Sequence, residues 1–234
     1  MLKISNLTKI YGDKRAVDSL NLHIQRGEIY GFIGHNGAGK TTTIKCACGI
    51  LNFEEGEIYI AGKSLKENPI ECKRKLAYIP DNPDLYEFLS GEGYLNFIAD
   101  VYGISKEDRE RDIKKYAQMF EIYDNLGDSV SSYSHGMKQK LALISAFIHR
   151  PELIIMDEPF VGLDPKASHL LKSLMREHCN AGGSIFFSTH VLEVAEKLCD
   201  KIAIIKNGKL AASGTMEEVK GSATLENVFL DLEG

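Results

Sequence analysis

A glycine-rich stretch near residue 40 constrains the fold of this chain more than any other feature. It reads Gly34-His35-Asn36-Gly37-Ala38-Gly39-Lys40-Thr41 and matches the phosphate-loop pattern G-x-x-x-x-G-K-[ST]. Glycines permit positive φ angles, so consecutive backbone N–H groups can curl around a phosphate. An apolar, strand-like run at residues 28–33 precedes the loop, and a helical stretch that includes Thr42 follows it. The pattern therefore predicts a strand, a phosphate-binding loop and a helix, in that order.

We expect this loop to bind a nucleoside triphosphate together with Mg²⁺. The Lys40 ammonium group would reach the β- and γ-phosphates, and the Thr41 hydroxyl group would ligate the metal. The start of the helix adds a positive dipole end that also attracts phosphate. An ordinary glycine turn is the alternative, and the strand and helix on either side of the loop favour phosphate binding over it.

Two acids, Asp157 and Glu158, follow the apolar run at residues 153–156. In open α/β sheets, ligands lie at the carboxyl ends of the strands. Asp157 is therefore predicted to hold Mg²⁺, directly or through water. Glu158 faces another direction and is predicted to polarise an attacking water. The alternative is that these are two solvated acids at the end of a strand. The presence of the phosphate loop in the same chain argues against this alternative.

The pattern of apolar residues divides the chain. Alternation or short apolar runs predict strands at residues 20–24, 28–33, 58–60, 76–79, 153–156, 184–187 and 202–205. Residues 85–134 instead show helical spacing, with Ser105 and Asp108 placed to cap a helix. Asn207-Gly208 predicts a hairpin with a type I′ turn, and residues 225–232 predict a short amphipathic helix. This indicates an α/β protein with an inserted helical segment.

Composition excludes some classes of protein. The formal net charge is −5, which argues against a general electrostatic grip on nucleic acid. No apolar run approaches the ~18 residues needed to cross a bilayer, and no signal peptide is visible, so a cytoplasmic location is expected. The five cysteines include no C-x-x-C pair, which indicates reduced thiols in the core. A metal site on Cys46 and Cys48 is the alternative, and no further ligands cluster near them.

Together these motifs resemble those of the ATP-binding cassette family, specifically the nucleotide-binding subunits of its transporters. The resemblance covers nearly the whole chain, in the family's order. Tyr11 resembles the aromatic residue that stacks on adenine, and His190 resembles the switch histidine that steadies the γ-phosphate. The segment Tyr133-Ser134-His135-Gly136-Met137 stands where the family has its Leu-Ser-Gly-Gly-Gln signature, and Val161-Gly162-Leu163-Asp164 resembles the loop after the acidic pair.

The resemblance implies a fold and an assembly. The fold is a P-loop NTPase core with a mixed sheet and an N-terminal antiparallel β subdomain, formed by residues 1–84 and 135–234. Residues 85–134 would form the inserted α-helical subdomain. Two subunits, expected to be copies of this chain, would enclose two ATP molecules. Ser134 and Gly136 of each would contact the ATP of the other, because Ser134 caps a helix whose free N–H groups suit phosphate.

Three positions depart from the family pattern. His135 replaces the first glycine of the signature, and Met137 replaces its glutamine. Asp81 stands where the loop after residues 78–80 carries glutamine, and it would contact Mg²⁺ or a metal-bound water there. The run Tyr-Ser-x-Gly-Met-Lys-Gln is similar to that of bacterial exporters whose membrane subunits are separate chains.

The resemblance also implies partners. Polytopic membrane subunits would contact the chain near residues 80–88, and the protein would be peripheral on the inner face of the cell membrane. The alternative for Leu85, Tyr86 and Phe88 is that they belong to the core of the helical insert. Two other functions remain open at this point: a cassette ATPase of a soluble machine such as iron–sulfur cluster assembly, and a regulatory module without turnover. The cargo, the direction of transport and the choice between homodimer and heterodimer are not encoded in these motifs.

Overall fold

The computed structural model describes residues 1–233, with only the backbone of Glu233. The chain forms two compact units. We call the first the core unit, and it comprises Met1–Tyr78, Glu152–Glu158 and Met175–Gly234. We call the second the helical unit, and it comprises Ile79–Pro151 and Pro159–Leu174. The helical unit is thus larger than the predicted insert of residues 85–134.

The core unit contains an antiparallel sheet with the strand order β2-β1-β4-β5. Its strands are β1 (Leu2–Tyr11), β2 (Lys14–Ile24), β4 (Glu55–Ile60) and β5 (Lys63–Ser64). On β2 the buried residues Leu20, Leu22 and Ile24 alternate with exposed ones, as their spacing predicts. The predicted N-terminal antiparallel β subdomain is therefore confirmed.

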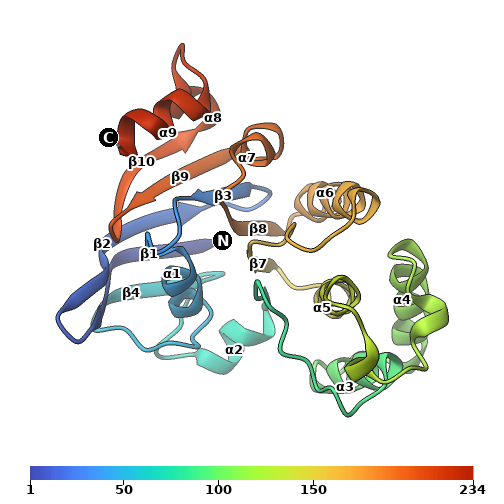
Figure 1. Cartoon of the computed structure of the whole chain (residues 1–234). Helices are drawn as coiled ribbons and strands as arrows, with labels where there is room; N and C mark the ends of the chain where they lie inside the picture. Colours follow the sequence, from blue (N-terminus) through green and yellow to red (C-terminus); the bar gives the residue numbers. More distant parts are fainter. Residues whose placement is uncertain (234) are drawn as a thin grey trace. The chain divides into compact units, whose positions relative to one another are not determined.

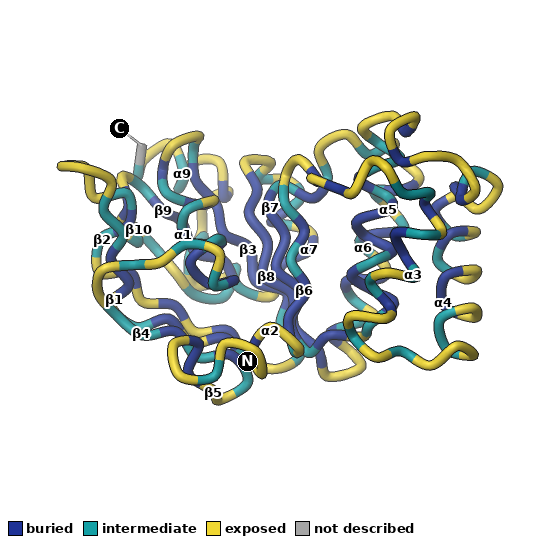
Figure 2. Tube along the Cα trace, turned by 90° about the horizontal axis from the view of Figure 1, so that it is seen from below, coloured by how far each residue is buried: buried dark blue, intermediate teal, exposed yellow. Residues whose placement is uncertain are grey.

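A second sheet has the strand order β10-β9-β3-β8-β7-β6. Its strands are β3 (Ile29–Ile33), β6 (Leu76–Ile79), β7 (Leu153–Asp157), β8 (Ser184–Thr189), β9 (Lys201–Lys206) and β10 (Lys209–Thr215). Strands β3, β7 and β8 pair in parallel and are buried along their whole length, as the dark segments of Figure 2 show. Burial on both faces explains why these strands read as continuous apolar runs.

The hairpin between β9 and β10 has the turn that the sequence predicts. Asn207 and Gly208 adopt φ angles of 50° and 79°. Two successive positive φ angles are what a type I′ turn requires. The antiparallel β10 also makes this sheet mixed, as expected.

The helices of the core unit cover both faces of the second sheet (Figure 1). They are α1 (Lys40–Ala47), α2 (Pro69–Arg74), α7 (Leu192–Leu198), α8 (Met216–Lys220) and α9 (Leu225–Glu233). Helix α1 contacts both β2 and β7, so it lies between the two sheets. Helix α7 covers the other face: a Cβ atom on Gly31 would lie 2.7 Å from Cys199 Sγ, at the end of α7, whereas Tyr30 and Phe32 face the core around α1.

The helical unit is built on helix α5. Its elements are α3 (Gly91–Val101), α4 (Lys106–Met119), the 3-10 helices η1 (Tyr123–Asn125) and η2 (Val130–Ser132), α5 (His135–Ile148) and the first part of α6 (Pro165–Asn180). Helices α3 and α4 both contact α5. Ser90, Ser105 and Ser134 each cap a helix by accepting a backbone N–H three residues on. The predicted cap at Ser105 is therefore confirmed.

The cysteines behave as small apolar residues. All five are free thiols and all are buried. Burial raises the pKa of the Cys46 thiol to about 11 and that of Cys179 to about 12. Within residues 1–233, no three His, Cys, Asp or Glu side chains are grouped to hold a metal ion, so Cys46 and Cys48 are not part of such a cluster. No described helix is both long and apolar enough to span a bilayer.

Candidate functional site

The phosphate loop connects β3 to α1, and its glycines are required by close contacts. Gly39 has a φ angle of 115°, and a Cβ atom there would lie 2.6 Å from the Ala16 carbonyl oxygen. A Cβ atom on Gly34 would lie 2.6 Å from the Ile205 carbonyl oxygen. The loop is therefore held tightly between the β1–β2 hairpin and β9, and only glycine fits at these positions.

The lysine of the loop is buried beneath it. The Lys40 side chain is 6% exposed. Its Nζ atom donates to the Gly34 carbonyl oxygen at 2.6 Å and to the His35 carbonyl oxygen at 3.3 Å. Asn36 and Gly37 are exposed. The ammonium group thus lies inside the curve of the loop, where a phosphate would be bound.

The start of helix α1 has no side-chain cap, because its N-cap residue is Gly39. Its first backbone N–H groups therefore remain available to an anion. Thr41 is exposed at this helix start, and Thr42 follows it half-buried. Ala38 is buried and holds the loop against β9 and β10 through the Gly208 N–H. The loop residues predicted to bind ATP therefore lie together around one helix N-terminus.

Asp157 ends β7 and is 1% exposed. No Lys, Arg or His nitrogen among residues 1–233 lies within 4.0 Å of its carboxylate to form an ion pair. A buried carboxylate without a cationic partner is costly, so this site fits a cation. Together with the Thr41 hydroxyl group it would offer the oxygen ligands that Mg²⁺ prefers, with water and phosphate completing the coordination shell.

Glu158 has a different environment from its neighbour. Its backbone adopts a φ angle of 48°. Its Oε1 atom lies 3.6 Å from Lys40 Nζ, and its Oε2 atom lies 3.0 Å from His190 Nδ1. The three residues predicted to be catalytic thus converge, although Glu158 follows β7, Lys40 begins α1 and His190 follows β8. A carboxylate in this position is able to take a proton from water.

Tyr11 is the last residue of β1, and its side chain is 48% exposed. The Lys9 Nζ atom lies 5.2 Å from the centre of its ring. The hairpin that follows Tyr11 brings Ala16 against Gly39 of the phosphate loop. An exposed ring on this hairpin is suited to stacking on a base.

The signature residues belong to the helical unit. Ser134 is exposed, and its Oγ atom accepts the Met137 N–H at 3.3 Å. The His135 ring packs against Gly162, where a Cβ atom would lie 2.5 Å from the ring. His135 therefore contacts the loop after the acidic pair from the place where the family has glycine. Asp81, also in this unit, is exposed.

The loop after the acidic pair is tied to α5. Asp164 Oδ2 lies 2.7 Å from Lys140 Nζ, and the Asp164 carboxylate accepts the Ala167 N–H. The Lys140 ammonium group lowers the pKa of the Asp164 carboxyl. This loop and the signature segment are thus parts of one connected structure.

Residues 80–88 contain both core and surface residues. Leu85 is buried, whereas Tyr86 is 49% exposed and Phe88 is 82% exposed. The Tyr86 ring contacts the rings of Phe88 and Phe97. Val101, on the same helix as Phe97, is also exposed. The helical unit thus carries an exposed aromatic patch, which we define as Tyr86, Phe88, Phe97 and Val101.

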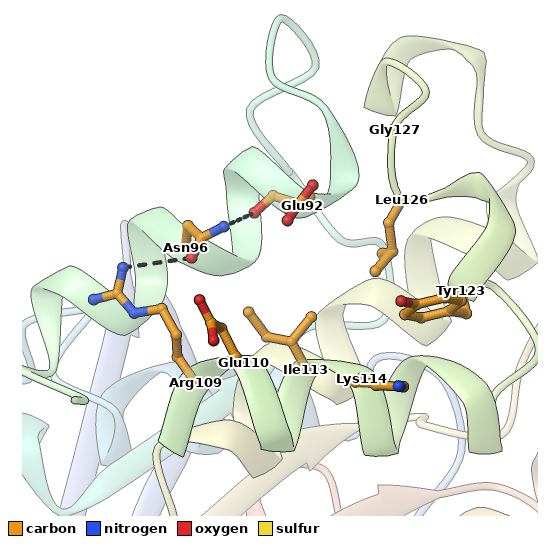
Figure 3. A pocket seen from close by; sticks show the side chains of 9 residues that line it. All are labelled: Glu92, Asn96, Arg109, Glu110, Ile113, Lys114, Tyr123, Leu126 and Gly127. Atoms are coloured by element: carbon orange, nitrogen blue, oxygen red, sulfur yellow. Dashed lines mark hydrogen bonds between the residues drawn. The ribbon is translucent and has the colours of Figure 1, made fainter. Parts of the chain in front are cut away.

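A pocket of about 470 Å³ lies elsewhere in the helical unit, between α3, α4 and η1 (Figure 3). Its lining includes Asn96, Arg109 and Tyr123. The Arg109 guanidinium group already donates to Asn96 Oδ1 and the Ile104 carbonyl oxygen. None of the predicted site residues lines this pocket, so the candidate site remains at the phosphate loop.

Ser188 is a site residue that sequence reasoning missed. It is fully buried on β8 and contacts both Asp157 and Glu158. The signal in the sequence is a serine and a threonine that interrupt a buried apolar strand just before His190.

Comparisons with known proteins place the chain among its relatives. The family model described as "ABC transporter" matches residues 17–161, more than half of the chain. The chain is 36% identical to the ABC-type transporter ATP-binding protein EcsA of Bacillus subtilis (strain 168), across 99% of this chain and 96% of that protein. It is 36% identical to the bacitracin transport ATP-binding protein BcrA of Bacillus licheniformis, across 94% of this chain and 71% of that protein.

Solved structures agree as well. A structure described as the ATP binding subunit of an ABC transporter has a TM-score of 0.96 and 36% sequence identity, and the match covers 100% of both chains. The ATP-binding cassette MJ0796, solved as a dimer bound to ADP and Pi, has a TM-score of 0.84 at 23% identity, over 92% of this chain and 99% of that one, and so shares the fold. The relatives are transporter proteins, which favours transport over a soluble assembly machine. With its phosphate loop, its acidic pair and these relatives, the chain belongs to the ABC transporter family, as an ATP-binding subunit and ATPase.

Proposed function

We propose that ATP is hydrolysed at the site formed by the phosphate loop, Asp157, Glu158 and His190. The observation that carries this proposal is the position of the Glu158 carboxylate between Lys40 Nζ and His190 Nδ1. Glu158 takes a proton from the attacking water, and Lys40 neutralises charge on the phosphates. His190, which is half exposed and has its Nδ1 atom 3.0 Å from Glu158 Oε2, steadies the γ-phosphate.

We assign Mg²⁺ to Asp157 and the Thr41 hydroxyl group. The buried Asp157 carboxylate, which forms no ion pair with another described residue, supports this assignment. When bound, the ion neutralises charge on the phosphate oxygens. The contact of Asp81 with the metal or its water stays a prediction. Tyr11 is the residue that we assign to the adenine ring, because its exposed side chain lies on the hairpin that contacts the loop.

The site is completed by a second copy of the chain. Ser134 and Gly136 of one copy would contact the γ-phosphate bound by the other. The exposed start of α5 supports this role, since helix N-termini bind phosphate and Ser134 is its cap. Closing of the two copies over ATP, and reopening after hydrolysis, would drive the attached membrane subunits between two states.

The membrane subunits would contact the aromatic patch of Tyr86, Phe88, Phe97 and Val101. A cluster of exposed apolar side chains marks an interaction surface more often than a single exposed apolar side chain does. A partner segment with an apolar face fits such a patch. The protein would then be peripheral on the inner face of the membrane. Export is the direction that we propose, because one relative is a bacitracin transport protein and another is the linearmycin resistance ATP-binding protein LnrL of Bacillus subtilis (strain 168).

Phosphate release by the purified chain tests the assigned roles. Glu158→Gln should lower turnover by ~10²–10⁴-fold and leave ATP affinity near the native value, since it removes only the general base. Lys40→Ala should weaken ATP binding on the order of 10- to 100-fold, because it removes a charged hydrogen bond to phosphate. Lys45→Ala, on the same helix, is the matched control and should bind ATP normally.

Native turnover in Glu158→Gln would remove Glu158 from the reaction. Unchanged ATP affinity in Lys40→Ala would remove the phosphate loop from nucleotide binding.

A further inference from the structure

The Ser188 hydroxyl group connects the two acids of the site. Ser188 lies on β8, where it is the register partner of Asp157 on β7. Its Oγ atom donates to Asp157 Oδ1 at 2.5 Å. The same Oγ atom accepts the Glu158 N–H at 3.0 Å. One hydroxyl group therefore holds the side chain of the first acid and the backbone of the second.

The backbone of Glu158 needs such support. Its φ angle of 48° lies in the left-handed region, which is unfavourable for a non-glycine residue. This turn directs the carboxylate toward His190 and Lys40, whereas Asp157 stays in line with the strand. A strained conformation persists only where surrounding contacts fix it, and the hydrogen bond to Ser188 is such a contact.

Packing alone does not account for a serine at this position. The residues before it on β8 are Ile185, Phe186 and Phe187, all fully buried. A hydroxyl group buried among such residues is unfavourable unless it is hydrogen-bonded. The bonds that satisfy Ser188 both go to the acids, so the acids explain the choice of serine.

A second serine on the same strand provides a comparison. Ser184 is also fully buried, and its Oγ atom donates to the Gln25 carbonyl oxygen at 2.8 Å. It stands at the opposite end of β8 and touches neither acid. The strand thus contains two equally buried serines, one with a partner in the backbone and the other with partners in the site.

We propose that Ser188 is a positioning residue for hydrolysis, acting through both acids. By donating to Asp157 Oδ1 it fixes the orientation of the carboxylate that would hold the metal, and by accepting the Glu158 N–H it fixes the direction of the general base. This inference rests on the proposed roles of Asp157 and Glu158. Residues that orient ligands and bases in this way typically contribute about 10- to 100-fold in metal affinity or activity.

The test compares Ser188→Ala, Ser188→Thr and the control Ser184→Ala in the full chain, with thermal unfolding to verify folding. Two quantities are measured: kcat and KM for ATP, and the affinity for Mn²⁺ in the presence of ATP, followed by electron paramagnetic resonance. Ser188→Ala should lower kcat and Mn²⁺ affinity by about 10- to 100-fold, with KM for ATP within about twofold of native. Ser188→Thr should restore both quantities, because it keeps the hydroxyl group. Ser184→Ala should leave both at the native value.

Native kcat and native Mn²⁺ affinity in Ser188→Ala would overturn the proposal. So would equal losses in Ser188→Ala and Ser184→Ala, which would assign the effect to strand packing. A folded Ser188→Thr variant as impaired as Ser188→Ala would also count against it. Native turnover in Glu158→Gln is a separate outcome. It would overturn the proposed role of Glu158 in hydrolysis, on which the role of Ser188 rests.

Discussion

At the scale of single residues, the fold gives two adjacent acids different surroundings. Asp157 continues the strand and is almost fully buried, whereas the left-handed turn at Glu158 brings its carboxylate to His190 and Lys40. We therefore propose the same group, a carboxylate, as metal ligand in one position and as general base in the next. What separates them is backbone direction, and Ser188 contacts both.

Histidine burial in the core unit predicts a pH dependence of stability. His178, on α6, packs against Gly183, and burial lowers the pKa of its imidazole. Below about pH 6.5 the unfolded chain binds a proton at His178 that the folded chain resists, so the free energy of unfolding falls as pH drops through this value. In His178→Gln, urea unfolding between pH 7.5 and 5.5 should show a shallower decline. His169→Gln, exposed on the same helix, should keep the native decline, and equal slopes in all three proteins would contradict this account.

The sequence predicts the candidate site residues best where they lie next to one another in the chain. The phosphate loop and the acidic pair each lie within a few consecutive residues, so their spacing alone indicates their roles. The association of Lys40, Glu158 and His190 needs the parallel order of β3, β8 and β7, which the motifs do not encode. Ser188 was missed for the same reason, since its partner Asp157 is 31 residues away and is brought beside it by strand register.

At the scale of elements, two helix starts lie at positions that we assign to the ATP site. Helix α1 begins at the phosphate loop without a side-chain cap, and α5 begins with the exposed, capped signature segment. The spacing of apolar residues predicted most of the strands and helices, because apolar residues recur where an element faces the core. The extent of the helical unit was harder to predict from the sequence. Helix α5 and the first part of α6 belong to this unit through tertiary contacts, which apolar spacing does not indicate.

Ser134 and Ser105 both cap a helix, but only Ser134 is also assigned to phosphate binding, so variants of the two serines distinguish helix capping from phosphate binding. Ser134→Ala and Ser105→Ala each remove the acceptor of a backbone N–H, so each should lower the free energy of unfolding by about 1 kcal/mol. Urea unfolding measures this loss. Only Ser134→Ala should also weaken ATP-dependent association of the chain, because only that serine is assigned to a phosphate. Identical association in the two variants would contradict the assignment of Ser134.

At the scale of the whole molecule, the proposed ATP site and the proposed partner surface use separate residues. The phosphate loop and the acidic pair belong to the core unit, whereas the aromatic patch belongs to the helical unit. A change in the patch is therefore expected to affect coupling to the partner and not hydrolysis itself.

Phe88→Ala tests this separation. Phe88 is 82% exposed, so its truncation should leave the free energy of unfolding within about 0.5 kcal/mol of the native value. The ATPase rate of the isolated chain should stay at the native value. Co-purification with the membrane subunits should fall on the order of tenfold or more, as for the loss of an aromatic anchor. Ile70→Ala, which is 69% exposed on α2 of the core unit, is the control and should keep the partner. Equal retention by the two variants would exclude the patch as the contact surface.

We infer that this chain carries half of each ATP site and that ATP closes two copies together. Sedimentation equilibrium of Glu158→Gln measures this directly, because slow hydrolysis keeps ATP bound. With ATP and Mg²⁺ the mass should double, and Ser134→Ala in the same background should weaken the dimer. Without ATP, or with Lys40→Ala added, the mass should remain that of one chain. A single-chain mass at saturating ATP, with ATP shown to be bound, would contradict the account.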